Sequence, residues 1–167
     1  MEATKPAGGD AALRAQLRDL LTSPHAHLPL EEVLVGLPAA LRGAHPPGQP
    51  HTLWRLLEHM RLAQRDIVEF SRHADHVSPQ WPEGYWPAAE APPDDAAWER
   101  SLQGVRDDLQ RFLALLTDPV SDLFAAFPWG KGQTLLREAL LIADHNAYHV
   151  GQMVTLRQLL GSWPPAP

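Results

Sequence analysis

Three histidines have the residue type and the spacing of metal ligands. His145 and His149 are four residues apart in the segment DHNAYHVGQ, residues 144–152. On a helix this spacing puts both imidazoles on one face, about one turn apart. His59 lies far away in sequence, in the segment LLEHM, residues 56–60. The three side chains can therefore meet only in a fold that packs these two segments side by side.

The residue types favour a mononuclear metal site with an open coordination position. Three neutral imidazoles are typical of catalytic zinc, and nickel, iron and manganese also accept nitrogen ligands. The chain has no cysteine, so the protein ligands must come from His, Asp and Glu. No His-Glu-x-x-His and no Glu-x-x-His occurs, which disfavours a zincin protease and a carboxylate-bridged di-iron bundle. A histidine pair at this spacing also occurs simply as a surface or capping pair, and that alternative stays open at this point.

Composition excludes several classes of function. The net charge is −6 and the 14 Lys and Arg residues form no dense run, so a nucleic-acid partner is not expected. No stretch approaches the roughly 20 apolar residues that cross a bilayer. Residues 1–10 do not have the pattern of a secretory signal. We therefore expect a soluble cytoplasmic protein without a membrane partner.

Prolines divide the chain into helical windows, because an interior proline breaks a helix. Four long stretches lack proline: residues 7–23, 51–78, 94–118 and 129–163. In each of them apolar residues recur at spacings of three and four, and no segment alternates with period two. The pattern predicts an all-α four-helix bundle that forms one domain over residues 1–167, with residues 1–9 as a disordered tail.

The connections between these windows are long. Residues 24–50, 75–93 and 119–133 exceed the usual helix-to-helix connections, which argues against simple up-down-up-down wiring. A short extra helix is expected around residues 30–37, ending at Pro38. Asp10 is expected to cap the first long helix.

Helical periodicity places the three histidines inward. His59 follows Leu56 by three residues, and His145 and His149 continue a row that also contains Gln152. Outer partners for the ring N–H groups are expected among the acidic residues Asp66, Glu138 and Asp144. The other six histidines are expected to be solvated. His51 is the exception, because it is expected two turns before His59 on the same helix.

Aromatic residues fall into two sets. Trp81, Tyr85 and Trp86 lie in one long connection, where they either wall a substrate cavity or anchor the connection, and we favour anchoring. Trp54 and Trp98 lie on the predicted helices and are expected in the core or at a dimer contact.

With these motifs in hand, the chain resembles the DinB-like (YfiT-like) superfamily of metal-dependent four-helix bundle proteins. The resemblance rests on PHTLWRLLEH, residues 50–59, and on DHNAYHVGQ, residues 144–152, and covers nearly the whole chain. It implies that His59, His145 and His149 are the metal ligands. It also implies up-down-down-up wiring and, frequently, a homodimer.

The resemblance implies one fold, but it leaves several functions open. Characterised relatives include S-transferases and an isomerase that depend on low-molecular-weight thiols. A first hypothesis is thus an enzyme whose metal, zinc or nickel first, activates a small thiol as thiolate toward an electrophilic small-molecule substrate. A second is a hydrolase with metal-activated water, which needs a general base such as Asp66 or Glu138. A third is a non-catalytic metal-binding dimeric bundle.

Overall fold

In the computed structural model the described part of the chain, residues 7–164, is helical and contains no β-strand beyond one isolated antiparallel bridge. The elements in chain order are α1 (Ala7–Thr22), α2 (Leu30–Leu34), the 3-10 turn η1 (Ala39–Leu41), α3 (Leu53–Arg72), the 3-10 turn η2 (Glu83–Tyr85), α4 (Asp95–Thr117) and α5 (Leu135–Leu159). The predicted helical bundle is confirmed. None of the described helices is long and apolar enough to cross a membrane.

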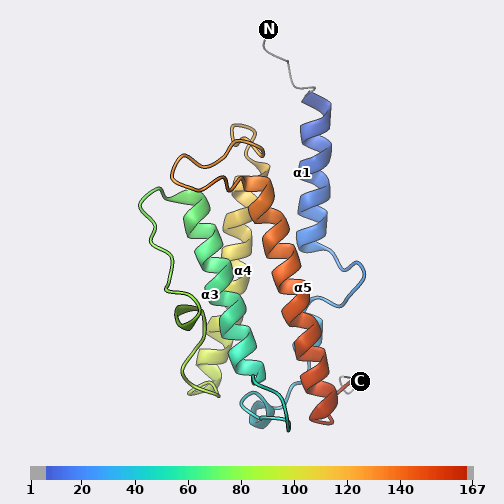
Figure 1. Ribbon diagram of the computed structural model, residues 1–167. Coiled ribbons are helices and arrows are strands. Elements are labelled where there is room, and N and C mark those ends of the chain that lie inside the picture. The colour runs from blue at the N-terminus through green and yellow to red at the C-terminus, as the bar shows by residue number, and fades with distance from the viewer. Residues whose placement is uncertain (1–6, 165–167) are drawn as a thin grey trace.

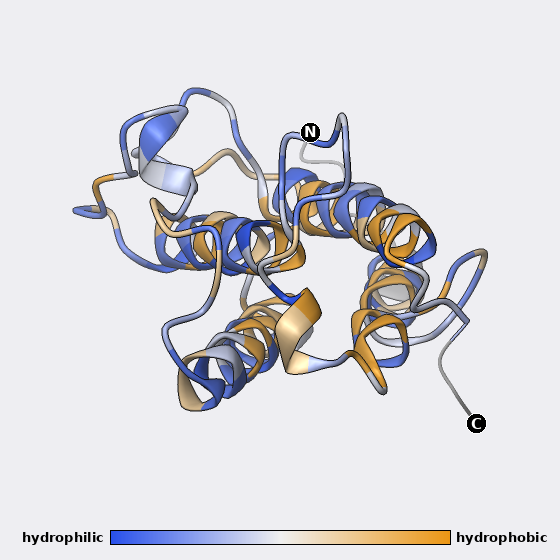
Figure 2. Cartoon of the chain, turned by 90° about the horizontal axis from the view of Figure 1, so that it is seen from below, coloured by the Kyte–Doolittle hydropathy of each residue, from blue (hydrophilic) through white to orange (hydrophobic). Residues whose placement is uncertain are grey.

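The long helices run in two directions. In Figure 1, α1 and α5 run downward while α3 and α4 run upward. The connection of residues 73–94 therefore spans the length of the bundle, from the upper end of α3 to the lower end of α4. Figure 2 looks along the bundle and shows the four long helices around a common centre. Because residues 73–94 run back along α3, residues midway along this connection can reach the middle of that helix.

Side-chain caps fix the starts of three helices. The side chain of Thr52 accepts a hydrogen bond from the backbone N–H of Arg55, that of Asp94 from Ala97, and that of Thr134 from Arg137. Each cap satisfies an N–H group that has no partner within its helix. Helix α4 lies within the predicted window of residues 94–118, with Asp94 as its cap, and α5 begins one residue after Thr134.

Replacing a cap tests how much local sequence contributes to α5. Thr134→Ala removes an acceptor from the first turn, so we expect the free energy of unfolding to fall by about 1 kcal/mol. Urea denaturation measures this change. Thr155→Ala on the exposed side of the same helix is the matched control, because it removes the same atoms without touching a cap. Equal losses in the two variants would contradict the assigned cap.

Three expectations for the helix boundaries need adjustment. Helix α1 begins at Ala7, inside the segment expected to be a tail, and residues 1–6 lie outside the described part. Asp10 therefore lies in the first turn rather than before it, and its carboxylate is 3.5 Å from the Arg14 guanidinium. His51 lies before α3, since Thr52 caps that helix and Leu53 starts it. The expected extra helix is present as α2 and ends before Pro38.

The bundle contains two separate apolar cores. The lower core joins α2, the first half of α3, the first half of α4 and the second half of α5. Its members include Trp54 and Trp98, whose ring centroids are 6.4 Å apart, so both tryptophans belong to the core as expected. The upper core joins α1, the end of α3, the second half of α4 and the start of α5. A protein of this size usually has one contiguous core, so this division needs an explanation.

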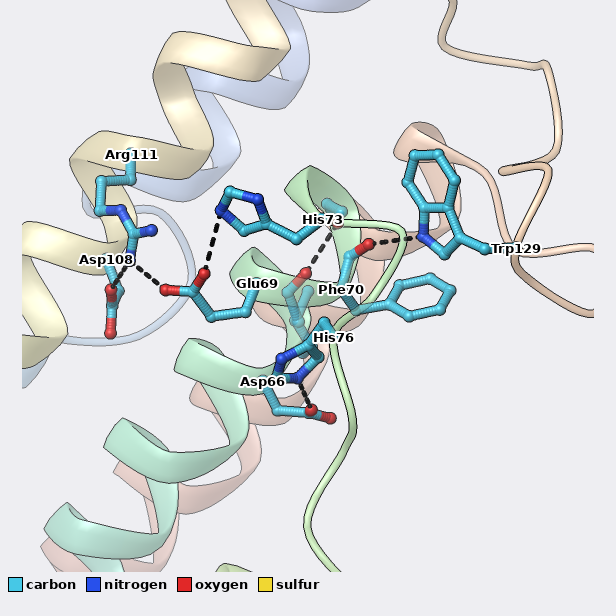
Figure 3. Close-up of polar contacts among 10 residues, drawn as sticks. Asp66, Glu69, Phe70, His73, His76, Asp108, Arg111 and Trp129 are labelled. Carbon is cyan, nitrogen blue, oxygen red and sulfur yellow. Dashed lines mark hydrogen bonds and ion pairs between the residues drawn. The ribbon is translucent and has the colours of Figure 1, made fainter.

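The connection of residues 73–94 is tied to α3 by polar contacts. Asp66 accepts hydrogen bonds from the Tyr85 hydroxyl and from Nε2 of His76, each 2.7 Å long. Figure 3 shows the His76 contact at the end of α3, together with the indole N–H of Trp129 donating to the Phe70 carbonyl. The two bonds to Asp66 fix where η2 lies against α3, and the position of η2 in turn determines the surroundings of His59.

Candidate metal centre

Helices α3 and α5 bring the three predicted histidines together. His59 is on α3 and His145 and His149 are on α5, and one ring nitrogen from each lies within 4.8 Å of the others. His59 and His149 are buried and His145 is half-buried. Each ring points inward because it lies on the apolar stripe of its own helix.

His59 is oriented by the 73–94 connection. Its Nδ1 lies 2.9 Å from the carbonyl oxygen of Tyr85, and a carbonyl can only accept, so Nδ1 carries the proton. In the neutral ring, Nε2 then holds a lone pair. Trp86 stacks on the imidazole at 3.9 Å between centroids and 3° between planes. The ring plane and the tautomer of His59 are therefore both fixed by residues next to η2.

His149 is oriented within its own helix. Its Nδ1 donates to Oε1 of Gln152 over 2.7 Å, and the amide nitrogen of Gln152 donates in turn to the Tyr148 hydroxyl over 3.3 Å. In this arrangement the amide oxygen faces the imidazole, so Nδ1 of His149 carries the proton. Nε2 of neutral His149 consequently holds a lone pair, as Nε2 of His59 does.

His145 completes the set at close range. Its Nε2 lies 3.0 Å from Nε2 of His59. At this distance Nε2–H of neutral His145 donates a hydrogen bond to the lone pair of His59 Nε2, and a metal ion bound by both nitrogens is the alternative. Nδ1 of His59 donates to Tyr85, so Nε2 of His59 is the acceptor in this contact and the proton belongs to Nε2 of His145. A metal ion bound at this point would take the place of that proton.

Burial keeps the three rings neutral. Desolvation lowers the pKa of His59, of His145 and of His149, and the pKa of His149 falls to about 4. Neighbouring histidines lower the last two further, since a second positive charge nearby is unfavourable. Only a neutral imidazole binds a metal ion, so the site is prepared for one at neutral pH.

The predicted acidic partners do not contact the ring nitrogens. Asp66 binds Tyr85 and His76, so it acts on His59 indirectly by holding η2. Glu138 is buried beside Arg137 at 2.6 Å, and burial raises its pKa. Asp144 is exposed and acts on His145 through its charge. In their place, the backbone carbonyl of Tyr85 and the side chain of Gln152 hold the imidazoles.

The aromatic residues of the 73–94 connection divide between the two roles considered for them. Trp81 is exposed, while Tyr85 anchors the connection through Asp66. Trp86 forms a wall of the site, because His59 stacks on one face and His51 on the other at 4.0 Å. His51 is thus not a solvated histidine, although it lies outside the group of three.

The donor set fits a single divalent ion. Within residues 7–164, the one group of three or more converging His, Asp and Glu side chains is His59, His145 and His149. Two of these have a fixed Nδ1–H donor, so their Nε2 lone pairs can face one ion. Three nitrogen donors leave at least one coordination position of a tetrahedral ion for another molecule.

Gln152 should affect the metal affinity of this site by orienting His149, although it is not itself a ligand. Gln152→Ala removes the acceptor that fixes the His149 tautomer, and losses of this kind weaken metal binding by about 10- to 100-fold. A competition titration with a chromophoric chelator measures the zinc affinity. Gln158→Ala on the exposed surface of α5 is the matched control. If both variants bind zinc as tightly as the wild type, Gln152 does not orient a ligand.

These features define a helical bundle with a buried three-histidine centre between two of its long helices. The family model of the DinB superfamily matches residues 29–153, which is more than half of the chain, and the chain belongs to this superfamily. The matched region contains all three histidines and Trp86, and it leaves out α1. No curated protein sequence and no solved structure matches the chain.

Proposed function

We propose that this protein is a metal-dependent enzyme that transfers the sulfur of a low-molecular-weight thiol to an electrophilic carbon. The observation that carries the proposal is the convergence of three neutral, oriented imidazoles on one point. Zinc or nickel fits these donors first, and iron or manganese is compatible with them. A bound ion of this kind supplies Lewis acidity, which lowers the pKa of a thiol or water that it coordinates.

The number of protein donors supports catalysis over a structural role. Structural zinc sites usually have four protein ligands, whereas this group offers three. The fold also has its own supports around the site, including the two apolar cores and the contacts of Asp66. A role limited to holding the bundle together is therefore the weaker interpretation.

The charge balance of the donors supports an anionic cosubstrate. Three neutral imidazoles leave the two positive charges of the ion uncompensated, so the remaining position favours an anion such as a thiolate. The chain has no cysteine, and the sulfur must come from outside. In the transfer, the thiol S–H bond breaks and its proton goes to solvent. A new S–C bond forms, and the leaving group departs from the electrophile with its electron pair.

Hydrolysis is the second candidate, and the positions of the acidic residues disfavour it. Water attack needs a nearby general base. The two carboxylates considered for this role have other partners, since Asp66 binds Tyr85 and His76 and Glu138 pairs with Arg137. Thiol transfer makes no such demand, because a thiol loses its proton more readily than water does.

A product screen tests the proposal. Protein loaded with zinc or nickel is incubated with small thiols and with an activated haloarene, an epoxide or an ester, and products are identified by mass spectrometry. We expect S-conjugates that need both metal and thiol and that are missing with His149→Ala. Products that form without thiol would favour the hydrolase. The proposal would be overturned if S-conjugates formed only at the uncatalysed rate with every combination of thiol and electrophile.

We further propose that the protein acts as a cytoplasmic homodimer with no nucleic-acid or membrane partner. The family resemblance supports the dimer, and the net charge of −6 speaks against nucleic acid. Light scattering at several protein concentrations tests the oligomeric state. A mass that stays at that of one chain throughout would refute the dimer.

A further inference from the structure

A large cavity lies between the two apolar cores and opens to the surface. Its volume is about 770 Å³, and all four long helices contribute to its wall. Met60 and Val105 reach it from the lower core, and Leu21, Leu109 and Ile142 reach it from the upper core and the residues packed against that core. The cavity therefore explains why the apolar interior is divided. We call this space the central cavity.

The central cavity is separate from the three-histidine centre. None of His59, His145 and His149 lines it, although their sequence neighbours Met60 and Asn146 do. Gln64 of α3 accepts a hydrogen bond from the Asn146 amide over 2.8 Å. Helices α3 and α5 thus present the histidines on one side and the central cavity on the other, and this amide pair joins the two helices.

The wall of the central cavity is mostly apolar, and its acidic and basic side chains, Glu31, Arg106 and Asp144, all lie at exposed positions. Gln64 donates to the Val105 carbonyl over 2.6 Å, so its amide is already satisfied at both ends. Arg106 lies 3.4 Å from Glu31, and the two charges compensate each other. A charged ligand would find no unpaired opposite charge in this pair. An uncharged molecule with mainly apolar surface would lose little hydration free energy on entering the cavity.

Part of the wall lies outside the matched family region. The end of α1 and residues 23–27 line the central cavity, whereas the family match begins at residue 29. His25 and His27 are exposed and also line it, so the cavity reaches the surface at this connection. Arg14 holds α1 in place through the carbonyl oxygens of Leu116 and Asp118. The part of the wall that α1 forms is thus anchored to the rest of the bundle.

We propose that the central cavity is a binding site for an uncharged, largely apolar small molecule, distinct from the metal centre. Its volume falls in the range of about 300–1,000 Å³ that is usual for small-molecule sites. Its wall is formed by the four long helices, the start of α2 and one connection, and this concave shape suits a small molecule better than the flat face of a protein partner. The site needs no metal, so it stands apart from the proposed sulfur transfer.

A dye titration tests the site. The probe is Nile red, an uncharged apolar dye whose fluorescence rises in apolar surroundings, added to the full-length protein. We expect saturable binding of one dye per chain. Leu109→Trp on α4 and Leu21→Trp on α1 fill the cavity from two sides, and each should weaken binding by about tenfold or more. Ala114→Trp adds the same ring on the exposed face of α4 and should change the affinity by less than about twofold.

Independent measurements separate this site from its alternatives. Circular dichroism checks folding, and if one filling variant does not fold, the other carries the comparison. His149→Ala should bind the dye normally, since it alters only the metal centre. Four results would overturn the proposal: no saturable binding, equal affinity in all variants, loss of binding in His149→Ala, or a changed solution mass in the filling variants. The last result would mean that a second copy of the chain covers the cavity.

Discussion

His149→Ala should lower the zinc affinity of the folded protein by about two to three orders of magnitude. Zinc sites with four protein ligands bind with roughly 10–16 kcal/mol, so one ligand accounts for about 2.5 to 4 kcal/mol. Each 1.4 kcal/mol corresponds to a factor of about ten in affinity. The expected loss is therefore larger than for Gln152→Ala, which leaves all three donors in place. A chelator competition titration at neutral pH measures it, and elemental analysis of protein purified without added metal gives a second readout.

His59→Ala should show a loss of the same size, because His59 comes from a different helix but supplies an equivalent nitrogen. His45→Ala is the matched control, since His45 is exposed and pairs with Glu90 away from the site. Circular dichroism must show that each variant is folded. Full metal content in both His59→Ala and His149→Ala would refute the assignment of this group as the metal site.

The helices were predictable because their signals are local. Prolines exclude helix from the connections, and Thr52, Asp94 and Thr134 each satisfy the first turn of the helix that follows. The start of α1 was the exception. Residues 7–9 carry no apolar periodicity, and Asp10 resembles a cap, so the pattern placed the first turn too late.

The metal centre was predictable where helical spacing determines it. His145 and His149 share a face of α5 by their spacing, and Gln152 follows His149 by three residues on the same face. This spacing was a sufficient signal for the role of Gln152. An acidic partner was expected instead, because carboxylates are frequent partners of metal-binding histidines.

The contribution of the 73–94 connection was not predictable. Tyr85 acts on His59 through its backbone carbonyl, which is chemically the same in every residue. Trp86 lies in a segment without periodicity, so no pattern says which way its ring faces. Both depend on how the connection folds back along α3, and the bond from Tyr85 to Asp66 joins residues 19 positions apart. The central cavity was not predictable for a similar reason, since residues far apart in sequence form its wall and no single motif marks it.

Metal-free protein should lose stability as the pH falls from neutral toward about 5, and His149 should account for about 2 kcal/mol of this loss. The pKa of His149 is about 4 in the folded protein against an ordinary value of 6.5. Between these values the unfolded chain binds a proton that the folded chain does not, so acid favours unfolding. The stability is therefore complete above the ordinary value and falls as the pH drops through the window. His59 and His145 add to the loss, because burial lowers the pKa of both.

Urea denaturation with a chelator present, at about pH 7.5 and about pH 5, measures this dependence. At the lower pH most carboxylates remain ionised, so the change reports mainly on histidines. His149→Asn removes the titrating ring, and its free energy of unfolding should change with pH by about 2 kcal/mol less than that of the wild type. His45→Asn should behave like the wild type. If the wild type and His149→Asn lose equal stability between the two pH values, His149 is not held neutral by burial, and the three nitrogens are not prepared for a metal in the way the geometry indicates.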